Sequence, residues 1–313
     1  MSDPKYLITN RLLLAPLTME DVGFILNLVN TPGWLQFIGD RGIKTEAGAA
    51  DYVRMLLANP DIQYWVVRLK ATQLPIGVVT FIKRPYLEHH DLGFAFLPAY
   101  AGQGFAKEAA AFVLDLVTEG EAHTHVLATT LKENAKSIRL LEQLGFQRNR
   151  TIQDEQNFLI LYALPADKWR IDQLTRAFFK VFKNVEGTPD WMLLERSCLP
   201  QATVVKKTDA IEEVYDLQSF IAPRKKMLTD GTLTGFQEKE IQSTTKIIGN
   251  IAQRYSKYQK SGYLDGTWFE GTGHKFFQFV KTSGGWKISA VLWEDEKPVN
   301  KTQEYRLKND GQN

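Results

Sequence analysis

The pattern of the chain changes at Pro165. Before this residue, short apolar runs alternate with helical patterns, whereas "ADKWRIDQLTRAFFKVFKN" after it opens an amphipathic helix that precedes a series of long strand patterns. Proline interrupts regular structure because it lacks a backbone donor. A chain of 313 residues has room for about two domains, each with its own core. We therefore predict one domain at residues 1–164 and another at residues 165–313.

Composition and charge exclude several classes of protein. The chain is 44% hydrophobic and 24% charged, which is typical of globular proteins. Its net charge of +2 gives no electrostatic case for a nucleic-acid partner. Its apolar runs are far shorter than the roughly 20 residues of a membrane span, and the N-terminus lacks the basic and apolar regions of a signal peptide. We predict a cytoplasmic protein without a membrane or nucleic-acid partner.

The single cysteine, Cys198, has no second cysteine with which to form an intrachain disulfide. No Cys/His cluster with metal-ligand spacing surrounds it. We interpret Cys198 as a buried core residue rather than a reactive thiol, and we predict no metal site.

The first part of the chain favours a mixed α/β fold with a largely antiparallel sheet and flanking helices. Thr18, followed three residues later by Asp21, is a good helix cap. Two β-branched and aromatic runs joined by the polar residues 71–74 predict a hairpin. We expect strands at residues 11–18, 64–69, 75–84, 91–98, 125–131 and 158–164, and helices after Thr18, at residues 45–60, from Phe105, and at residues 134–146.

Two glycines, Gly102 and Gly104, lie between the strand that ends at Pro98 and the helix that begins at Phe105. A helix N-terminus carries unpaired N–H groups and a partial positive charge, so it attracts anions that can come close. Glycine removes the Cβ atom that would block this approach. The stretch predicts a phosphate cradle, although the spacing alone also suits a simple turn.

Two motifs, in order, resemble those of the GNAT N-acetyltransferases. "AYAGQGFA" is similar to their acetyl-CoA pyrophosphate loop, Gln/Arg-x-x-Gly-x-Gly/Ala, with Ala101 at the first position, Gly104 at the fourth and Ala106 at the last. Ala101 lacks the side chain usual at that position. "ENAKSIRLLEQLGFQ" resembles the second signature in its RimJ/RimL-branch form, as does the segment at residues 37–53. The resemblance extends over nearly all of residues 5–164.

The resemblance implies direct transfer of an acetyl group from acetyl-CoA to a primary amine of a protein N-terminus, a peptide or a small molecule. It implies that backbone groups of Phe94, Ala95 and Phe96 pair with the pantetheine arm. Asn134 is expected both to cap its helix and to face the cofactor. The amides expected to hold the pyrophosphate are those of Gly102, Gln103, Gly104, Phe105, Ala106 and Lys107.

The catalytic groups follow from the resemblance less directly. Leu141 stands where many of these enzymes carry a tyrosine as acid, and the branch resembled has a serine at the position of Ser137 instead. The Ser137 hydroxyl would either hydrogen-bond the thioester sulfur or only satisfy backbone donors in the first turn of its helix. Asp91, beside His89 and His90, is the candidate base, and Asn134 completes the catalytic set.

Acceptor choice is expected from the loop "NTPGWLQFIGDRG". Trp34 and Phe37, with Ile38, would form an apolar lip, unless the two aromatic side chains merely cover the core. Asp40 and Arg41 would add charges that orient an amine or a peptide carboxylate.

Residues 166–298 resemble the nuclear-transport-factor-like, SnoaL-like superfamily in their opening helix, "FIAPRKKMLTDG" and "GGWKISAVLWEDE". The resemblance implies an α+β cone with a curved antiparallel sheet, used for small-molecule binding or homodimer formation. We expect strands at residues 235–250, 251–271, 274–282 and 286–296. Arg224, Glu240, Tyr258 and His274 are the polar candidates for the pocket, unless they are simply paired residues of the core or rim. The alternative function for the whole chain is a catalytically weak acyl-CoA-binding module coupled to this domain.

Overall fold

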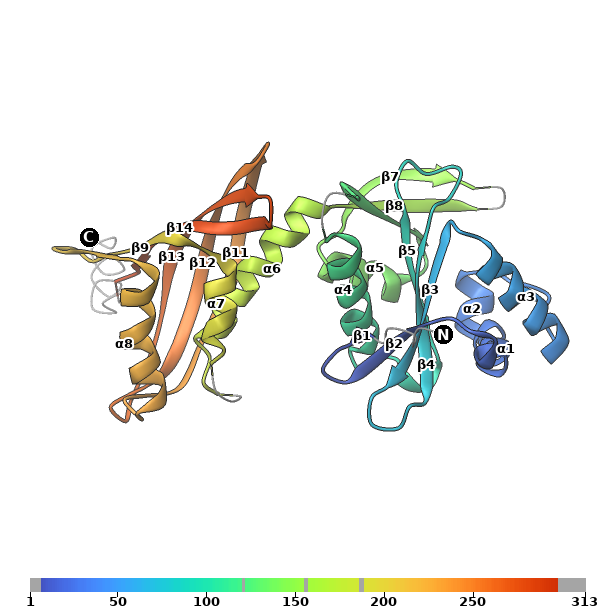
Figure 1. The fold of residues 1–313 in the computed structure, drawn as a ribbon, viewed down its shortest axis with the longest axis horizontal. Helices are drawn as coiled ribbons and strands as arrows, with labels where there is room; N and C mark the ends of the chain where they lie inside the picture. Colours follow the sequence, from blue (N-terminus) through green and yellow to red (C-terminus); the bar gives the residue numbers. More distant parts are fainter. Residues whose placement is uncertain (1–6, 120–121, 155–156, 186–188, 298–313) are drawn as a thin grey trace, which may run out of the picture. The chain divides into compact units, whose positions relative to one another are not determined.

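The computed structural model describes residues 7–119, 122–154, 157–185 and 189–297 (Figure 1). The chain divides into two compact units, Met1–Trp169 and Arg170–Asn313. The division falls inside helix α6 (Ala166–Val181), because Trp169 in its first turn is fully buried in the core of the first unit. The Trp169 indole N–H donates to Asp115 Oδ1 at 2.9 Å.

The first unit is built on a mixed sheet of eight strands in the order β1-β2-β3-β4-β5-β6-β8-β7. Neighbouring strands are antiparallel except β5 and β6, which are parallel. The expected mixed and largely antiparallel sheet is therefore confirmed. The strands are β1 (Leu7–Ile8), β2 (Leu12–Pro16), β3 (Ile62–Leu69), β4 (Pro75–Ile82), β5 (Asp91–Phe96), β6 (His125–Leu131), β7 (Gln147–Gln153) and β8 (Phe158–Pro165).

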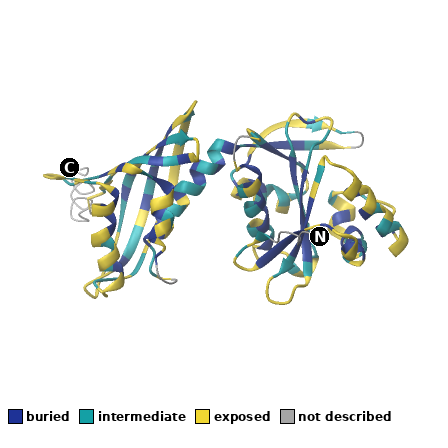
Figure 2. Cartoon of the chain, in the orientation of Figure 1, coloured by how far each residue is buried: buried dark blue, intermediate teal, exposed yellow. Residues whose placement is uncertain are grey.

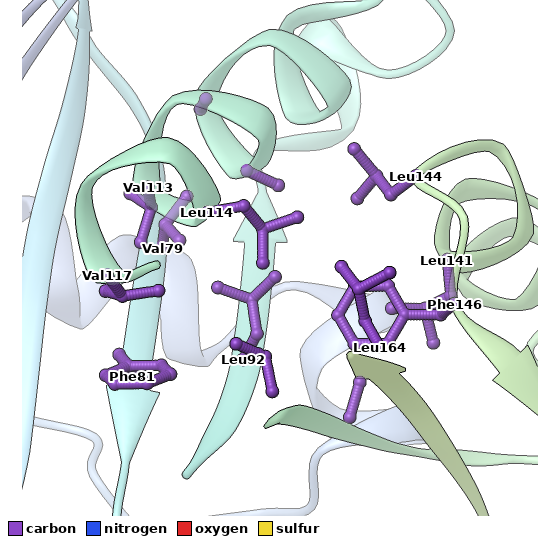
Figure 3. Packing of buried hydrophobic residues seen from close by; sticks show 14 of the residues in the cluster. Val79, Phe81, Leu92, Val113, Leu114, Val117, Leu141, Leu144, Phe146 and Leu164 are labelled. Atoms are coloured by element: carbon purple, nitrogen blue, oxygen red, sulfur yellow. The ribbon is translucent and has the colours of Figure 1, made fainter. Parts of the chain in front are cut away.

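Helices cover both faces of this sheet (Figure 1). On one face lie α4 (Phe105–Val117) and α5 (Ala135–Gln143), whose apolar sides meet those of the central strands (Figure 3). On the other face lie α1 (Val22–Val29), α2 (Pro32–Phe37) and α3 (Glu46–Ala58), over a second cluster of buried residues. Figure 2 shows the central strands buried and the outward side of α3 exposed. Short 3-10 turns at Met19–Asp21 (η1) and Pro98–Tyr100 (η2) precede α1 and the α4 loop.

The local signals of the first unit are confirmed where they depend on neighbouring residues. Thr18 and Asp21 form a reciprocal capping box. Strand β7 was not predicted, because its side chains are mostly polar and exposed and it pairs only with β8, so it lacks the alternation of a half-buried strand. Helix α2 lies where a loop was expected, and Pro32 at its first position is consistent with a helix start.

The second unit has a sheet of six strands in the order β10-β9-β14-β13-β12-β11. Its core joins alternate residues of these strands to α6, α7 (Trp191–Ser197) and α8 (Leu217–Thr229). The strands are β9 (Cys198–Lys207), β10 (Glu212–Tyr215), β11 (Leu233–Ile248), β12 (Ile251–Leu264), β13 (Thr267–Thr282) and β14 (Gly285–Asp295).

Two expectations for the second unit need correction. The sheet is not wholly antiparallel, because β9 comes from a separate hairpin and pairs in parallel with β14. The strand expected at residues 251–271 is two strands, β12 and β13, joined at Asp265 and Gly266, which have φ of 48° and 75°. Both values lie in the left-handed region that Asp-Gly hairpin turns require.

Cys198 is buried, and burial raises the pKa of its thiol to about 12, as expected of a core cysteine. No helix in the described ranges is long and apolar enough to cross a membrane. Among the same residues, no group of three or more His, Cys, Asp or Glu side chains is arranged to hold a metal ion.

Candidate active site

Strands β5 and β6 separate almost as soon as they meet. Their register includes one pair, Asp91 with Leu127. The other edge of β5 continues its antiparallel pairing with β4, and Leu97 N–H donates to Ile76 O at 2.9 Å. Because backbone groups alternate between the two edges of a strand, those of Phe94 and Phe96 face the side that β6 has left. The backbone groups of Ala95, which were also expected to pair with the pantetheine arm, instead face β4.

Asp91 lies at the point where the two strands separate. Its Oδ1 accepts the Thr129 N–H at 3.0 Å, and its Oδ2 accepts the Arg84 Nε–H at 2.6 Å. The residue is only 2% exposed. Burial raises the pKa of Asp91, although Arg84 and Thr129 favour its charged form. The carboxylate thus replaces a backbone bond between the strands and holds them apart.

The loop before α4 presents unpaired backbone amides. Gly102 and Gly104 have φ of 76° and 80°, which favours glycine, and a Cβ on Gly102 would meet no atom within 4 Å. Within the described ranges, no amide from Gly102 to Lys107 donates to a protein acceptor. The residues from Ala101 to Gly104 are exposed, so these amides remain open to an anion.

Helix α5 begins with the predicted cap. Asn134 Oδ1 accepts the Ser137 N–H at 3.1 Å. Both residues are half-buried, and the Ser137 hydroxyl makes no hydrogen bond to another residue in the part of the chain described. Leu141 is 1% exposed and packs in the core, so its position cannot present a polar group to a substrate.

Comparisons with known proteins agree with this geometry. The family profile described as "Acetyltransferase (GNAT) domain" matches residues 11–147. The uncharacterized N-acetyltransferase YnaD of Bacillus subtilis is 26% identical over 144 residues, which are 46% of this chain and 83% of that protein. The matched range contains both the α4 loop and the separating strands.

This part of the chain is a GNAT acetyltransferase domain. The protein is accordingly an N-acetyltransferase, and acetyl-CoA is the acetyl donor of this family.

Solved structures of similar fold include two acetyltransferases. A GNAT-family acetyltransferase from Bacillus anthracis has 21% identity and a TM-score of 0.45, covering 52% of this chain and 99% of its own. The spermidine N-acetyltransferase of Vibrio cholerae, solved with CoA and spermine, has 19% identity and a TM-score of 0.45, covering 51% of this chain and 99% of its own.

The acetyltransferase domain differs from expectation at the apolar lip. Trp34 is only 6% exposed and packs in the core under α1 to α3, so it is not a lip residue. Phe37 is half-buried, and Ile38 is exposed at the surface.

Asp40 and Arg41 are exposed, as expected of residues that meet a substrate. The Asp40 carboxylate accepts the Gly42 N–H at 2.8 Å and lies 3.5 Å from Lys44 Nζ. These contacts, the Gly42 bond foremost, keep the pKa of Asp40 below its usual value. Asp40 is therefore negatively charged near neutral pH.

Sequence reasoning missed a pair of buried polar atoms beside this loop. The Trp34 indole N–H and the Tyr64 hydroxyl have no hydrogen-bond partner in the described part of the chain. Tyr64 pairs in register with Thr80 of β4, which pairs with Gly93 of β5, so this row reaches the strand that separates from β6. Burial raises the pKa of Tyr64, while the charge of Arg41 acts in the opposite direction. Unpaired buried polar groups are rare, so each calls for an explanation, of which a functional role is one.

The two histidines expected beside Asp91 belong to a separate aromatic cluster. His90 stacks on Phe81 with ring centroids 4.6 Å apart, and His89 stacks on His125 at 5.1 Å. His89 and His125 also line a cavity of about 190 Å³ with Leu127 of β6 and with Arg150 and other residues of β7 and β8. These contacts give no support to a proton relay between the histidines and Asp91.

Proposed function

We propose that acetyl-CoA binds along the open edge of β5, with its diphosphate at the α4 loop, and that the acetyl group passes directly to a primary amine in a ternary complex. The separation of β5 from β6 at Asp91 carries this proposal. Among the residues that the structure describes, it leaves peptide groups of Phe94 and Phe96 unpaired beside the loop amides, and such groups can pair with the amides of a pantetheine arm.

The residues of the α4 loop suit a diphosphate. The amides from Gly102 to Lys107 are unpaired in the described structure, and they lie at the positive end of the α4 dipole. The two glycines leave room for close approach, because a Cβ on Gly102 would project into open space. Asn134, whose carboxamide N–H groups bind no other residue in the described ranges, is proposed to contact the same molecule from the start of α5.

The reaction requires few groups from the protein. Acetyl-CoA supplies an activated acyl carbon: the amine nitrogen forms a bond to this carbon, the carbon–sulfur bond breaks, the nitrogen loses a proton and the sulfur gains one. A backbone N–H of Phe94 or Phe96 is proposed to donate to the carbonyl oxygen as negative charge develops there. The Ser137 hydroxyl, which has no protein partner in the described ranges, is proposed to donate to the sulfur.

Asp91 has a different role in this proposal from the expected base. Both of its oxygens are occupied by Arg84 and Thr129, so it fixes the strand separation and acts through the backbone. We therefore assign it to positioning rather than to removal of the proton from the amine.

We propose that the acceptor enters on the α1 to α3 face, beside Phe37, Asp40 and Arg41. The unpaired Tyr64 hydroxyl supports this placement, because an acceptor that reaches it would satisfy a buried polar group. The motif resemblance to the RimJ/RimL branch favours the amine of a protein N-terminus or a peptide over a small-molecule amine.

A thiol-release assay tests the proposed function. The full chain is incubated with acetyl-CoA and, in separate reactions, peptides with free or blocked N-termini, polyamines and simple primary amines. We expect release of coenzyme A that depends on a free amine, with acetylated product detected by mass spectrometry. Binding of coenzyme A in calorimetry without turnover on any acceptor would instead favour the acyl-CoA-binding module.

For the second unit, we propose a SnoaL-like cone that also pairs two copies of the chain. A row of apolar side chains crosses the sheet on the face away from the helices, because Val214, Val205, Leu292, Phe276 and Tyr255 are in register on successive strands. Val214, Phe276 and Leu292 are 66%, 48% and 44% exposed. Sedimentation analysis is expected to find a dimer that Phe276→Lys converts to monomer, and a monomeric parent chain would contradict this proposal.

A further inference from the structure

The α4 loop is contacted by an arginine that lies far from it in the sequence. Arg11, directly before β2, donates from Nη1 to the carbonyl oxygen of Gln103 at 3.1 Å. Its guanidinium lies 4.4 Å from the centroid of the Phe105 ring. Its Nη2 is 3.4 Å from the position that a Cβ on Gly104 would occupy. The cation therefore lies directly against the glycine turn and the first residue of α4.

The same arginine is tied to Glu108 in the first turn of α4. Arg11 Nε donates to Glu108 Oε2 at 2.6 Å, and the Arg11 backbone N–H donates to Oε1 at 2.9 Å. The Thr9 hydroxyl adds a third bond to Oε1 at 2.6 Å. Although partial burial raises the pKa of Glu108, these bonds keep it below its usual value. Glu108 is therefore an anion held beside the amides proposed to receive a diphosphate.

An anion at this place opposes the binding of another anion unless a cation compensates it. Arg11 provides that compensation at 2.6 Å, and its side chain is 44% exposed. Its Nη2 donates to no residue in the described ranges, so this N–H group is available at the loop. Ala101, the residue at the first position of the loop motif, has no side chain that could supply a charge.

We propose that Arg11 is a positioning residue of the diphosphate site: it offsets the charge of Glu108, holds the Gln103 carbonyl away from the amides and provides the positive charge that Ala101 lacks. This inference rests on the proposed binding of acetyl-CoA at the α4 loop. It predicts that the benefit of Arg11 is confined to donors that contain the diphosphate.

Calorimetric titration with coenzyme A tests this role in the full chain. We expect Arg11→Ala to weaken coenzyme A binding about tenfold, the equivalent of about 1.4 kcal/mol. Arg11→Lys keeps the charge but loses the paired geometry, so it is expected to give an intermediate affinity. In the double variant Arg11→Ala, Glu108→Gln the uncompensated anion is absent, and part of the lost affinity should return.

Turnover with S-acetylpantetheine, which lacks the diphosphate, provides a readout that a merely structural role would not give. We expect Arg11→Ala to raise the KM for acetyl-CoA while the kcat/KM for S-acetylpantetheine is unchanged. Arg54→Ala is the matched control, because Arg54 forms an exposed ion pair with Asp51 on α3, away from the loop.

Two results would overturn the role of Arg11: equal affinity of Arg11→Ala and the parent chain for coenzyme A, or an equal loss with both donors. If Arg11→Ala does not fold, as judged by circular dichroism, the same comparison is made with Arg11→Lys. A parent chain that binds no coenzyme A would contradict the proposed function itself, which distinguishes the two failures.

Discussion

At Asp91, a side-chain carboxylate takes the place of a backbone acceptor in the hydrogen bonding between β5 and β6. The carboxylate joins Arg84 of the loop after β4 to Thr129 of β6, and its burial prevents water from replacing either partner. An aspartate at this position suggested a catalytic base. The hydrogen bonds to Arg84 and Thr129 show that both oxygens of its carboxylate are occupied. Buried charges whose partner is removed are costly, so this site should be sensitive to substitution.

Asp91→Ala is expected to lower the free energy of unfolding by about 3 kcal/mol, because it leaves the partly buried Arg84 cation without its partner. Asp91→Asn retains an oxygen for the Thr129 amide and should be less destabilised. Urea unfolding and acetyl-transfer rates are measured for both variants. An Asp91→Ala variant with full stability and full coenzyme A affinity, but without turnover, would restore the assignment as base.

Tyr64 offers a second test at this scale. Tyr64→Phe removes a buried hydroxyl that has no partner in the described part of the protein, so the variant should unfold at the same or a higher temperature. If the acceptor uses this hydroxyl, its KM should rise about fivefold, the effect of about 1 kcal/mol. An unchanged acceptor KM would show that the hydroxyl does not contact the acceptor.

At the scale of elements, the loop before α4 combines a left-handed backbone with unpaired amides. The loop is exposed, whereas the helix that follows buries Phe105, Ala109, Ala110 and Val113. The packed helix thus fixes the position of the exposed loop that precedes it. The helix was predictable from its apolar spacing, and the loop from its two glycines.

Gly102→Ala should weaken coenzyme A binding about tenfold, because a methyl group would project into the space where the anion is proposed to bind. Gly231→Ala is the matched control. Gly231 has φ of 90° and equally open surroundings, so both variants carry about 1–2 kcal/mol of backbone strain. Equal coenzyme A affinity of the two variants in calorimetry would argue against the cradle.

At the scale of the whole molecule, four of the five histidines gather at one end of β5 and β6. His90 and His123 contact each other and Phe81 through their rings, and His89 stacks on His125. Burial, followed by the charge of neighbouring groups, lowers the pKa of His90, His123 and His125. Histidine charge should therefore affect the stability of the folded chain in mildly acidic solution.

The sign of this effect follows from proton binding. Below the unfolded value of about 6.5, and above the lowered folded values, the unfolded chain binds more protons than the folded chain, so stability falls as the pH falls. We expect the thermal midpoint of the parent chain to drop between about pH 7.5 and pH 5.5. His123→Gln should reduce this drop, and an identical drop in both proteins would exclude a contribution from His123.

Interactions between residues that are close in the sequence determine many of the local features of this protein, and these features could be predicted from the sequence alone. The caps at Thr18 and Asn134, the apolar spacing of α4 and the glycines before it depend on backbone geometry over a few positions, so the sequence displays them directly. Tertiary structure alone decided which distant side chains meet. Arg11 reaches Glu108 across 97 positions, Asp91 reaches Thr129 across 38, and β9 joins β14 in parallel. Such pairs depend on how the strands and helices pack, and the identity of a residue does not reveal its partner.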